Sequence, residues 1–147
     1  IFTLGFSGVK VGLDFASEFD MEYGSLDLEK GFSLAFDNQD DDSKWGTGFE
    51  YLMPTKIEDT SGTKLSMISL YGLYEFSKSE QTSIFGKIGY SKPFLSEDID
   101  IDGGMMYGIQ FNFNKIQVSY TIHSGSIDEY EDIDVDLNRF VFYYPFN

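Results

Sequence analysis

Residues 104–124 have the sequence GMMYGIQFNFNKIQVSYTIHS, in which two regular alternations follow one another. Large apolar side chains occupy every second position from Met105 to Phe113, and again from Ile116 to Ile122. Glycine and polar residues fill most of the positions between them. A period of two is that of a β-strand, whose successive side chains point to opposite faces. The stretch therefore predicts two antiparallel strands with a tight turn between them.

The same alternation recurs along the whole chain. We distinguish eight runs, at residues 4–15, 26–37, 44–56, 64–76, 82–92, 104–113, 115–124 and 134–146. Most are about ten residues long, the length that a tilted strand needs to cross a bilayer. The connections after the second, fourth and sixth runs are short, and most of the others are longer. This pattern predicts an all-β fold, an antiparallel up-and-down eight-stranded transmembrane β-barrel, as one domain over residues 1–147.

The size of the apolar side chains indicates which face points outward. An eight-stranded barrel has an interior just wide enough for side chains to fill, and four or five large residues per strand would overfill it. We therefore expect lipid to face the apolar set, which includes Ile88, Tyr107, Ile109, Val118, Tyr120 and also Leu28. The first and last runs change phase near Ser7 and Asn138, so each requires either a bulge or a different strand boundary.

Composition excludes several classes of function. The chain has 25 acidic and 10 basic residues and a net charge of −15, so nucleic-acid binding is not expected. It has no cysteine, which excludes disulfides and thiolate metal sites. No apolar run is long enough for a membrane-spanning helix. We expect a mature chain from which a signal peptide has been cleaved.

Three further stretches carry a family resemblance: ISLYGLYEF (68–76), SIFGKIGYSKPF (83–94) and the closing RFVFYYPFN (139–147). With the 104–124 stretch, they resemble small outer-membrane barrels of the OmpX/OmpA type. The resemblance implies a structural or surface role in a Gram-negative-type outer membrane, with outer-membrane lipids and lipopolysaccharide as partners. An enzymatic barrel of this kind would need a base with a nucleophile, or paired acids, at its outer rim, and since the sequence does not identify such a set we do not expect an enzyme.

The polar face of the predicted barrel contains charges of both signs. Because a charge in a narrow lumen needs a partner, we expect an ion-pair network that plugs the barrel. Its predicted members are Lys10, Glu29, Glu50, Glu75, Lys87 and Arg139. His123, the only histidine, is interpreted as a polar lumen residue, although a histidine also suits a general base or a metal ligand. Ser124 and Ser126 lie beside it in sequence, which does not create a triad.

The longer loops hold 15 of the 25 acidic residues. Two stretches, SEDIDIDGG (96–104) and DEYEDIDVD (128–136), place acids at alternate positions. The first begins like an EF-hand calcium loop. Such a loop has Glu at its twelfth position, which counted from Asp98 is Ile109 here, so the complete motif is absent. A different calcium site, or a self-assembly contact between acidic loops, remains open. The candidate ligands are Asp98, Asp100, Asp102, Asp132, Asp134 and Asp136.

The alternative to a membrane barrel is a soluble lipocalin-like barrel that carries a small apolar ligand. It would turn the apolar face inward around a cavity. The two interpretations differ in what the centre of the barrel contains.

Overall fold

The computed structural model describes residues 8–21, 24–39, 44–58, 62–96, 101–114, 116–127 and 133–145. Ten β-strands account for most of them: β1 (Val9–Met21), β2 (Gly24–Leu28), β3 (Gly31–Gln39), β4 (Trp45–Lys56), β5 (Lys64–Lys78), β6 (Thr82–Leu95), β7 (Ile101–Asp102), β8 (Gly104–Phe113), β9 (Ile116–Ile127) and β10 (Ile133–Pro145). No helix in this described part is long and apolar enough to span a bilayer.

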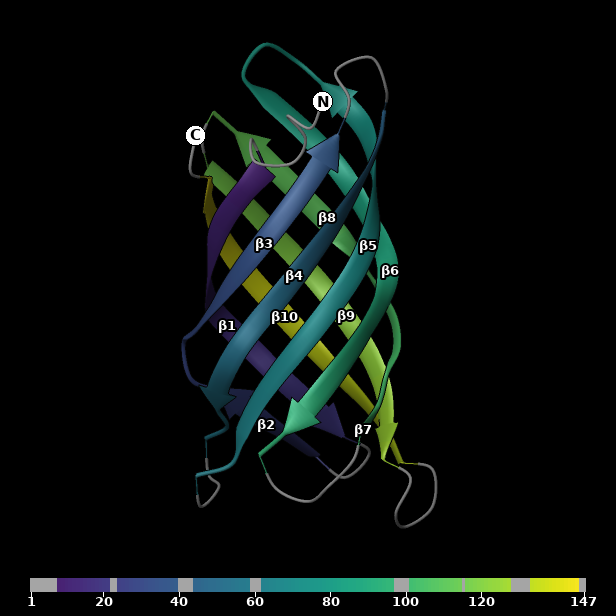
Figure 1. The fold of residues 1–147 in the computed structure, drawn as a ribbon. Helices are drawn as coiled ribbons and strands as arrows, with labels where there is room; N and C mark the ends of the chain where they lie inside the picture. The colour runs from purple at the N-terminus through teal and green to yellow at the C-terminus, as the bar shows by residue number, and fades with distance from the viewer. Residues whose placement is uncertain are drawn as a thin grey trace.

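The strands form a closed antiparallel barrel (Figure 1). Each long strand pairs with the next along the chain, and β1 pairs with β10 from Lys10↔Pro145 to Met21↔Val135. The short strands β2 and β7 precede β3 and β8 directly, so the wall contains eight strands. Strand β1 begins and β10 ends at the end of the barrel that carries the short turns (Figure 1). This confirms the predicted fold class.

Apolar side chains cover the outside of the barrel, as predicted. Ile88 and Ile109 are 53% and 51% exposed, and Tyr107 lies beside Ile88 in the β6–β8 register. Charged side chains lie inside, where Arg139 has 0% exposure and Lys10 is also buried. A soluble barrel has the opposite arrangement, so this polarity is that of a barrel surrounded by hydrocarbon.

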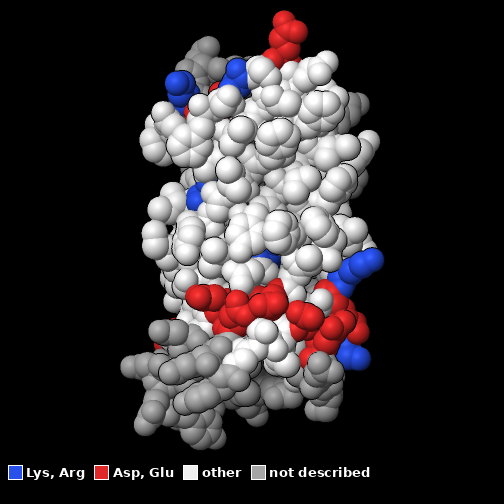
Figure 2. Space-filling view, turned by 180° about the vertical axis from the view of Figure 1, so that it is seen from behind, with Lys and Arg blue, Asp and Glu red and all other residues white. Residues whose placement is uncertain are grey.

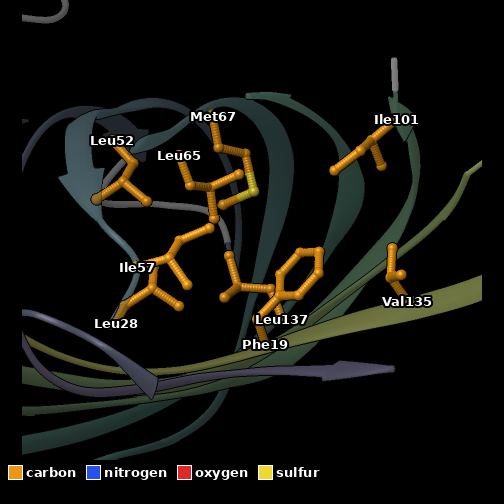
Figure 3. Packing of buried hydrophobic residues seen from close by; sticks show 9 residues of the cluster. All are labelled: Phe19, Leu28, Leu52, Ile57, Leu65, Met67, Ile101, Val135 and Leu137. Atoms are coloured by element: carbon orange, nitrogen blue, oxygen red, sulfur yellow. The ribbon is translucent and has the colours of Figure 1, made fainter. Parts of the chain in front are cut away.

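The interior is not polar along its whole length. At the end with the long loops, nine buried apolar side chains from β1, β2, β4, β5, β7, β10 and the residue after β4 point toward one another (Figure 3). They are Phe19, Leu28, Leu52, Ile57, Leu65, Met67, Ile101, Val135 and Leu137, which we call the apolar plug. Burial of each such side chain stabilises the fold by about 1.5–3 kcal/mol.

The apolar plug corrects two expectations. Leu28 points inward and not to lipid. The phase change expected near Asn138 is wrong: inward side chains alternate without a break from Val135 to Tyr143, and the interior itself changes from apolar to polar. The bulge of the first strand lies between Asp14 and Ala16, whereas Ser7 is outside the described residues.

Candidate functional site

One guanidinium at the centre of the lumen contacts two carboxylates. Arg139 on β10 donates from Nε to Asp14 Oδ2 at 2.7 Å and from Nη2 to Asp14 Oδ1 at 2.8 Å. It also donates from Nη1 and Nη2 to the two carboxylate oxygens of Glu50, at 3.1 and 3.2 Å. All three side chains are buried. Because the contacts to Asp14 are short and paired, the planar fork of arginine fixes the geometry as well as the charge.

A second ion pair lies nearer the short-turn end. Lys10 Nζ is 2.6 Å from Asp37 Oδ2, and it also donates to the side-chain oxygens of Gln110 at 3.2 Å and Gln117 at 2.7 Å. The Lys10 ammonium lies 4.2 Å from the centre of the Tyr143 ring. An ammonium removed from water is thus surrounded by four groups that favour its charge.

Two tyrosines connect these pairs to a third cation. The Tyr143 hydroxyl donates to Glu50 at 2.6 Å, and the Tyr71 hydroxyl donates to Asp37. The Lys87 ammonium lies over both rings, 4.6 Å from the centre of Tyr71 and 5.1 Å from that of Tyr143. Lys87 Nζ is buried and has no hydrogen-bond acceptor among the described residues, so the ring faces are its nearest stabilising groups.

The lumen charges are balanced in number. Three cations (Lys10, Lys87 and Arg139) and three carboxylates (Asp14, Asp37 and Glu50) form one connected group, which we call the lumen network. With one carboxylate for each cation, the network has no net charge when all six are ionised. Removing a charge from water costs several kcal/mol unless it is paired, so a balanced set is the arrangement that a closed interior tolerates.

The predicted network is right in four members and wrong in one. Lys10, Glu50, Lys87 and Arg139 lie inside the barrel. Glu29 is exposed at the break between β2 and β3.

Glu75 is half-buried at the bulge between Glu75 and Ser77 of β5, and the described contacts include no ion pair of its side chain. The sequence analysis missed Asp14, Asp37, Tyr71 and Tyr143. Asp14 lies on the same strand face as Lys10, which was the available signal.

Two inward glycines leave room for the tyrosine rings. A Cβ at Gly48 would lie 2.3 Å from the Tyr71 ring, and one at Gly12 would lie 2.8 Å from the Tyr143 ring. Real side chains do not approach so closely, so each glycine is required by the ring that crosses in front of it.

We therefore expect Gly48→Ala to lower the free energy of unfolding by about 1–3 kcal/mol, because the added methyl displaces Tyr71. Urea unfolding of the folded barrel measures this change. Gly72→Ala is the matched control: its Cβ points outward and finds no atom within 3.8 Å. Equal effects of the two variants would contradict the packing described here.

His123 is a buried lumen residue, as interpreted. Its Nε2 is 2.9 Å from Thr121 Oγ1, and its Nδ1 is 2.9 Å from Ser91 Oγ. Both ring nitrogens are therefore hydrogen-bonded to hydroxyl groups. The serine beside the ring is Ser91, from β6, and among the described contacts neither Ser124 nor Ser126 is hydrogen-bonded to it. His123 and both of its partners are buried, so this group does not form an exposed acid–base site.

The predicted calcium ligands are only partly described. Asp98, Asp100 and Asp132 lie outside the described residues, and of Asp134 only the backbone is described. Asp102 and Asp134 are both registered opposite Ser126 on β9, so the structure brings the two acidic stretches to neighbouring strands. Among the residues that the structure describes, no three His, Cys, Asp or Glu side chains form a group that would hold a metal ion.

Acidic side chains do gather on the outside of the barrel near the long loops. Figure 2 shows Asp and Glu in a band between the apolar wall and the grey end. On three adjacent strands, Glu18 of β1 is registered with Asp27 of β2, and Asp20 of β1 with Asp136 of β10. We call these four residues the acidic band. A hydrogen bond and repulsion between Glu18 and Asp20 raise the pKa of Glu18, which lies beyond the last outward apolar residue of β1.

Comparison with known proteins supports the same architecture. No family model matches the chain, and no curated protein matches it in sequence. Among solved structures, Ail of Yersinia pestis in complex with the heparin analogue sucrose octasulfate is similar, with a TM-score of 0.57, 16% identity, and 97% of this chain and 99% of Ail covered.

Neisserial surface protein A is similar with a TM-score of 0.56 and 12% identity, over 94% of this chain and 96% of that one. The outer membrane enzyme PagL is similar with a TM-score of 0.53 and 13% identity, over 93% and 99%. At these identities the likeness establishes the fold alone. That fold is the small eight-stranded barrel of the OmpX/OmpA type.

Proposed function

We propose that this chain is an integral surface protein of a Gram-negative-type outer membrane. In this proposal its lumen is closed to solutes, and its acidic long-loop end faces outward and interacts with lipopolysaccharide through divalent cations. The observation that carries the proposal is the inverted polarity of the barrel, with Ile88 and Ile109 exposed on the wall and Arg139 fully buried at the centre. Similarity of fold to three outer-membrane proteins supports the location.

The contents of the lumen argue against a carrier or an open pore. A soluble carrier needs an apolar cavity for its ligand, whereas the centre of this barrel contains three carboxylates and three cations, which ion pairs and the two tyrosines connect. A porin needs a continuous aqueous path, which requires a barrel wider than eight strands. Here the lumen network fills the centre, and the apolar plug fills the long-loop end.

The acidic end favours cations as the link to a membrane surface. Ail is described with a polyanion, but this chain has a net charge of −15 and would repel one. Lipopolysaccharide is anionic as well, so the acidic band and the lipid phosphates both need a counter-ion. Divalent cations coordinate carboxylate and phosphate oxygens alike and would bridge the two.

Reconstitution tests the proposed function. We expect the protein to stay in the membrane fraction until detergent is added, and to insert into planar bilayers without steady conductance, because the lumen is filled. A protein that remains soluble without detergent would contradict the location. A large, stable open channel would contradict the closed lumen while leaving the location intact.

Calcium should act at the acidic end. We expect millimolar calcium to raise the melting temperature, because it screens the repulsion between neighbouring carboxylates, and a chelator to reverse the change. Light scattering in the same samples measures whether ions between acidic loops also join barrels.

The variant Asp102→Asn/Asp136→Asn should respond less than the parent. Glu80→Gln, which removes an exposed carboxylate at the short turn between β5 and β6, is the control. If neither the melting temperature nor the particle size responds to calcium, the alternating acids are charged strand ends only.

A further inference from the structure

The outer surface of the barrel is hollowed by a groove of about 710 Å³ over β5, β6 and β8. Its floor contains Gly72 and Gly86, which lie on the outward face of adjacent strands. One side of the groove is formed by the rings of Trp45, Tyr74 and Phe76. The ring centres of Trp45 and Tyr74 are 4.7 Å apart, and those of Tyr74 and Phe76 are 5.2 Å apart. On the other side stand Tyr107, Tyr120 and Ile122.

The protein does not fill this hollow with its own side chains. The Phe76 ring lies over Gly86, 2.6 Å from where a Cβ would be. Above Gly72 the nearest atoms are backbone oxygens, at 3.8 and 3.9 Å from a Cβ built there. The atoms that line an empty apolar groove have no partner atoms on one side and lose dispersion contacts there, so a surface of this shape favours binding of an apolar ligand.

The groove presents no charged side chain that would pair with a charged ligand. Its one ionisable cation is Lys87, whose ammonium points into the lumen over Tyr71 and Tyr143. The groove begins at Trp45, the first residue of β4, beside the short turns, and it crosses the strands. Trp45, Tyr74, Gly86, Ile109 and Tyr120 are successive partners in the register from β4 to β9. At about 4.8 Å between neighbouring strands, these four steps span about 19 Å. The groove is also continuous with the lipid-facing wall, so hydrocarbon is the medium that reaches it.

We propose that this groove binds one acyl chain of a phospholipid from the leaflet on the short-turn side. The inference rests on the proposed membrane location and adds a specific lipid site to it. Trp45 stands at the rim, where tryptophan suits the boundary between headgroups and hydrocarbon. The acyl chain lies along the Gly72 floor between the aromatic wall and Tyr107.

A second copy of the chain fits the groove less well. A two-fold contact places the same patch of both subunits face to face. Two grooves would then lie hollow against hollow, and the space above Gly72 would remain empty in both. A thin, flexible hydrocarbon chain fills it instead.

The single tryptophan of the chain makes the site measurable. Trp45 is 64% exposed and lines the groove, so bromine atoms on a bound acyl chain will quench its fluorescence. The protein is reconstituted in phosphatidylcholine vesicles that contain an increasing fraction of chain-brominated phosphatidylcholine. Gly72→Phe fills the groove from its floor, and Val118→Phe adds bulk to the wall on β9 outside it.

We expect the parent and Val118→Phe to be quenched at low brominated fractions, and Gly72→Phe to lose that early quenching. If Gly72→Phe does not insert, Tyr107→Ala replaces it: this variant removes a side of the groove without adding bulk and should lose the same quenching. Equal quenching of the groove variant and the parent would overturn the proposal. Quenching that depends on the protein-to-lipid ratio, and not on the brominated fraction, would identify a second copy as the occupant and also overturn it.

Failure of this inference is distinct from failure of the proposed function. If the membrane location is wrong, the parent does not insert and Trp45 is not quenched by any lipid. If only the acyl-chain site is wrong, all variants insert and are quenched alike.

Discussion

Replacement of Arg139 by methionine is expected to lower the free energy of unfolding by about 3–5 kcal/mol, the usual cost of breaking a buried ion pair from one side. Arg139 is fully buried and contacts both Asp14 and Glu50. Without the guanidinium, two carboxylates remain close together away from water. Urea unfolding of the barrel in lipid vesicles measures the change.

Two further variants show whether charge imbalance is the cause. The double variant Asp14→Asn/Arg139→Met removes one carboxylate together with the guanidinium, so two cations and two carboxylates remain in the lumen network, and it should recover most of the lost stability. Lys78→Met removes a cation that is exposed at the end of β5, and its effect should stay within about 0.5 kcal/mol. If Arg139→Met loses no more than Lys78→Met, the shared arginine does not hold the lumen network together.

Replacement of Ile109 by arginine should cost about 2–4 kcal/mol, the range found for basic residues at the bilayer midplane of barrel proteins. Ile109 lies in the middle of β8 and is 51% exposed on the outer wall. In water, exchange of an exposed isoleucine for arginine would cost almost nothing. The sign and size of the effect therefore report whether hydrocarbon surrounds this position.

Asp136→Arg is the matched control, because Asp136 is exposed in the acidic band beyond the apolar wall. It should fold as well as the parent, since it replaces one of several crowded carboxylates. Ile88, Tyr107, Val118 and Tyr120 should respond to arginine as Ile109 does. Arginine variants that fold into bilayers as well as the parent would contradict the assignment of this face to lipid.

Local pattern was enough to predict most of the wall. Between residues 64 and 124 the strands alternate regularly apart from the bulge between Glu75 and Ser77. The structure places the following residues outward as expected: Ile68, Leu70, Met105, Phe111 and Ile116. The prediction failed where the environment inside the barrel changes along a strand. Leu28 and Leu137 are apolar and inward, because they contribute to the apolar plug. Alternation alone cannot distinguish this case from a phase change.

Membership of the lumen network was predictable only in part. Lys10, Glu50, Lys87 and Arg139 were identified because a charge on the polar face of a strand has to point inward. Their partners were not identifiable in the same way. Asp14 and Arg139 are 125 residues apart in the chain, and Glu50 and Arg139 are 89 apart.

The sequence by itself determined the number of wall strands, their order and, outside the apolar plug, the face that each turns outward, since these follow from a period of two and from the size of side chains. Only the tertiary structure decided which charges pair, where the interior becomes apolar, and where the outer wall is hollow. The physical reason is that these features depend on distances across the barrel. The ring of Tyr71 lies in front of Gly48, and Arg139 lies between Asp14 and Glu50. The floor at Gly72 stays open because only backbone oxygens, at 3.8 and 3.9 Å, lie near a Cβ built there.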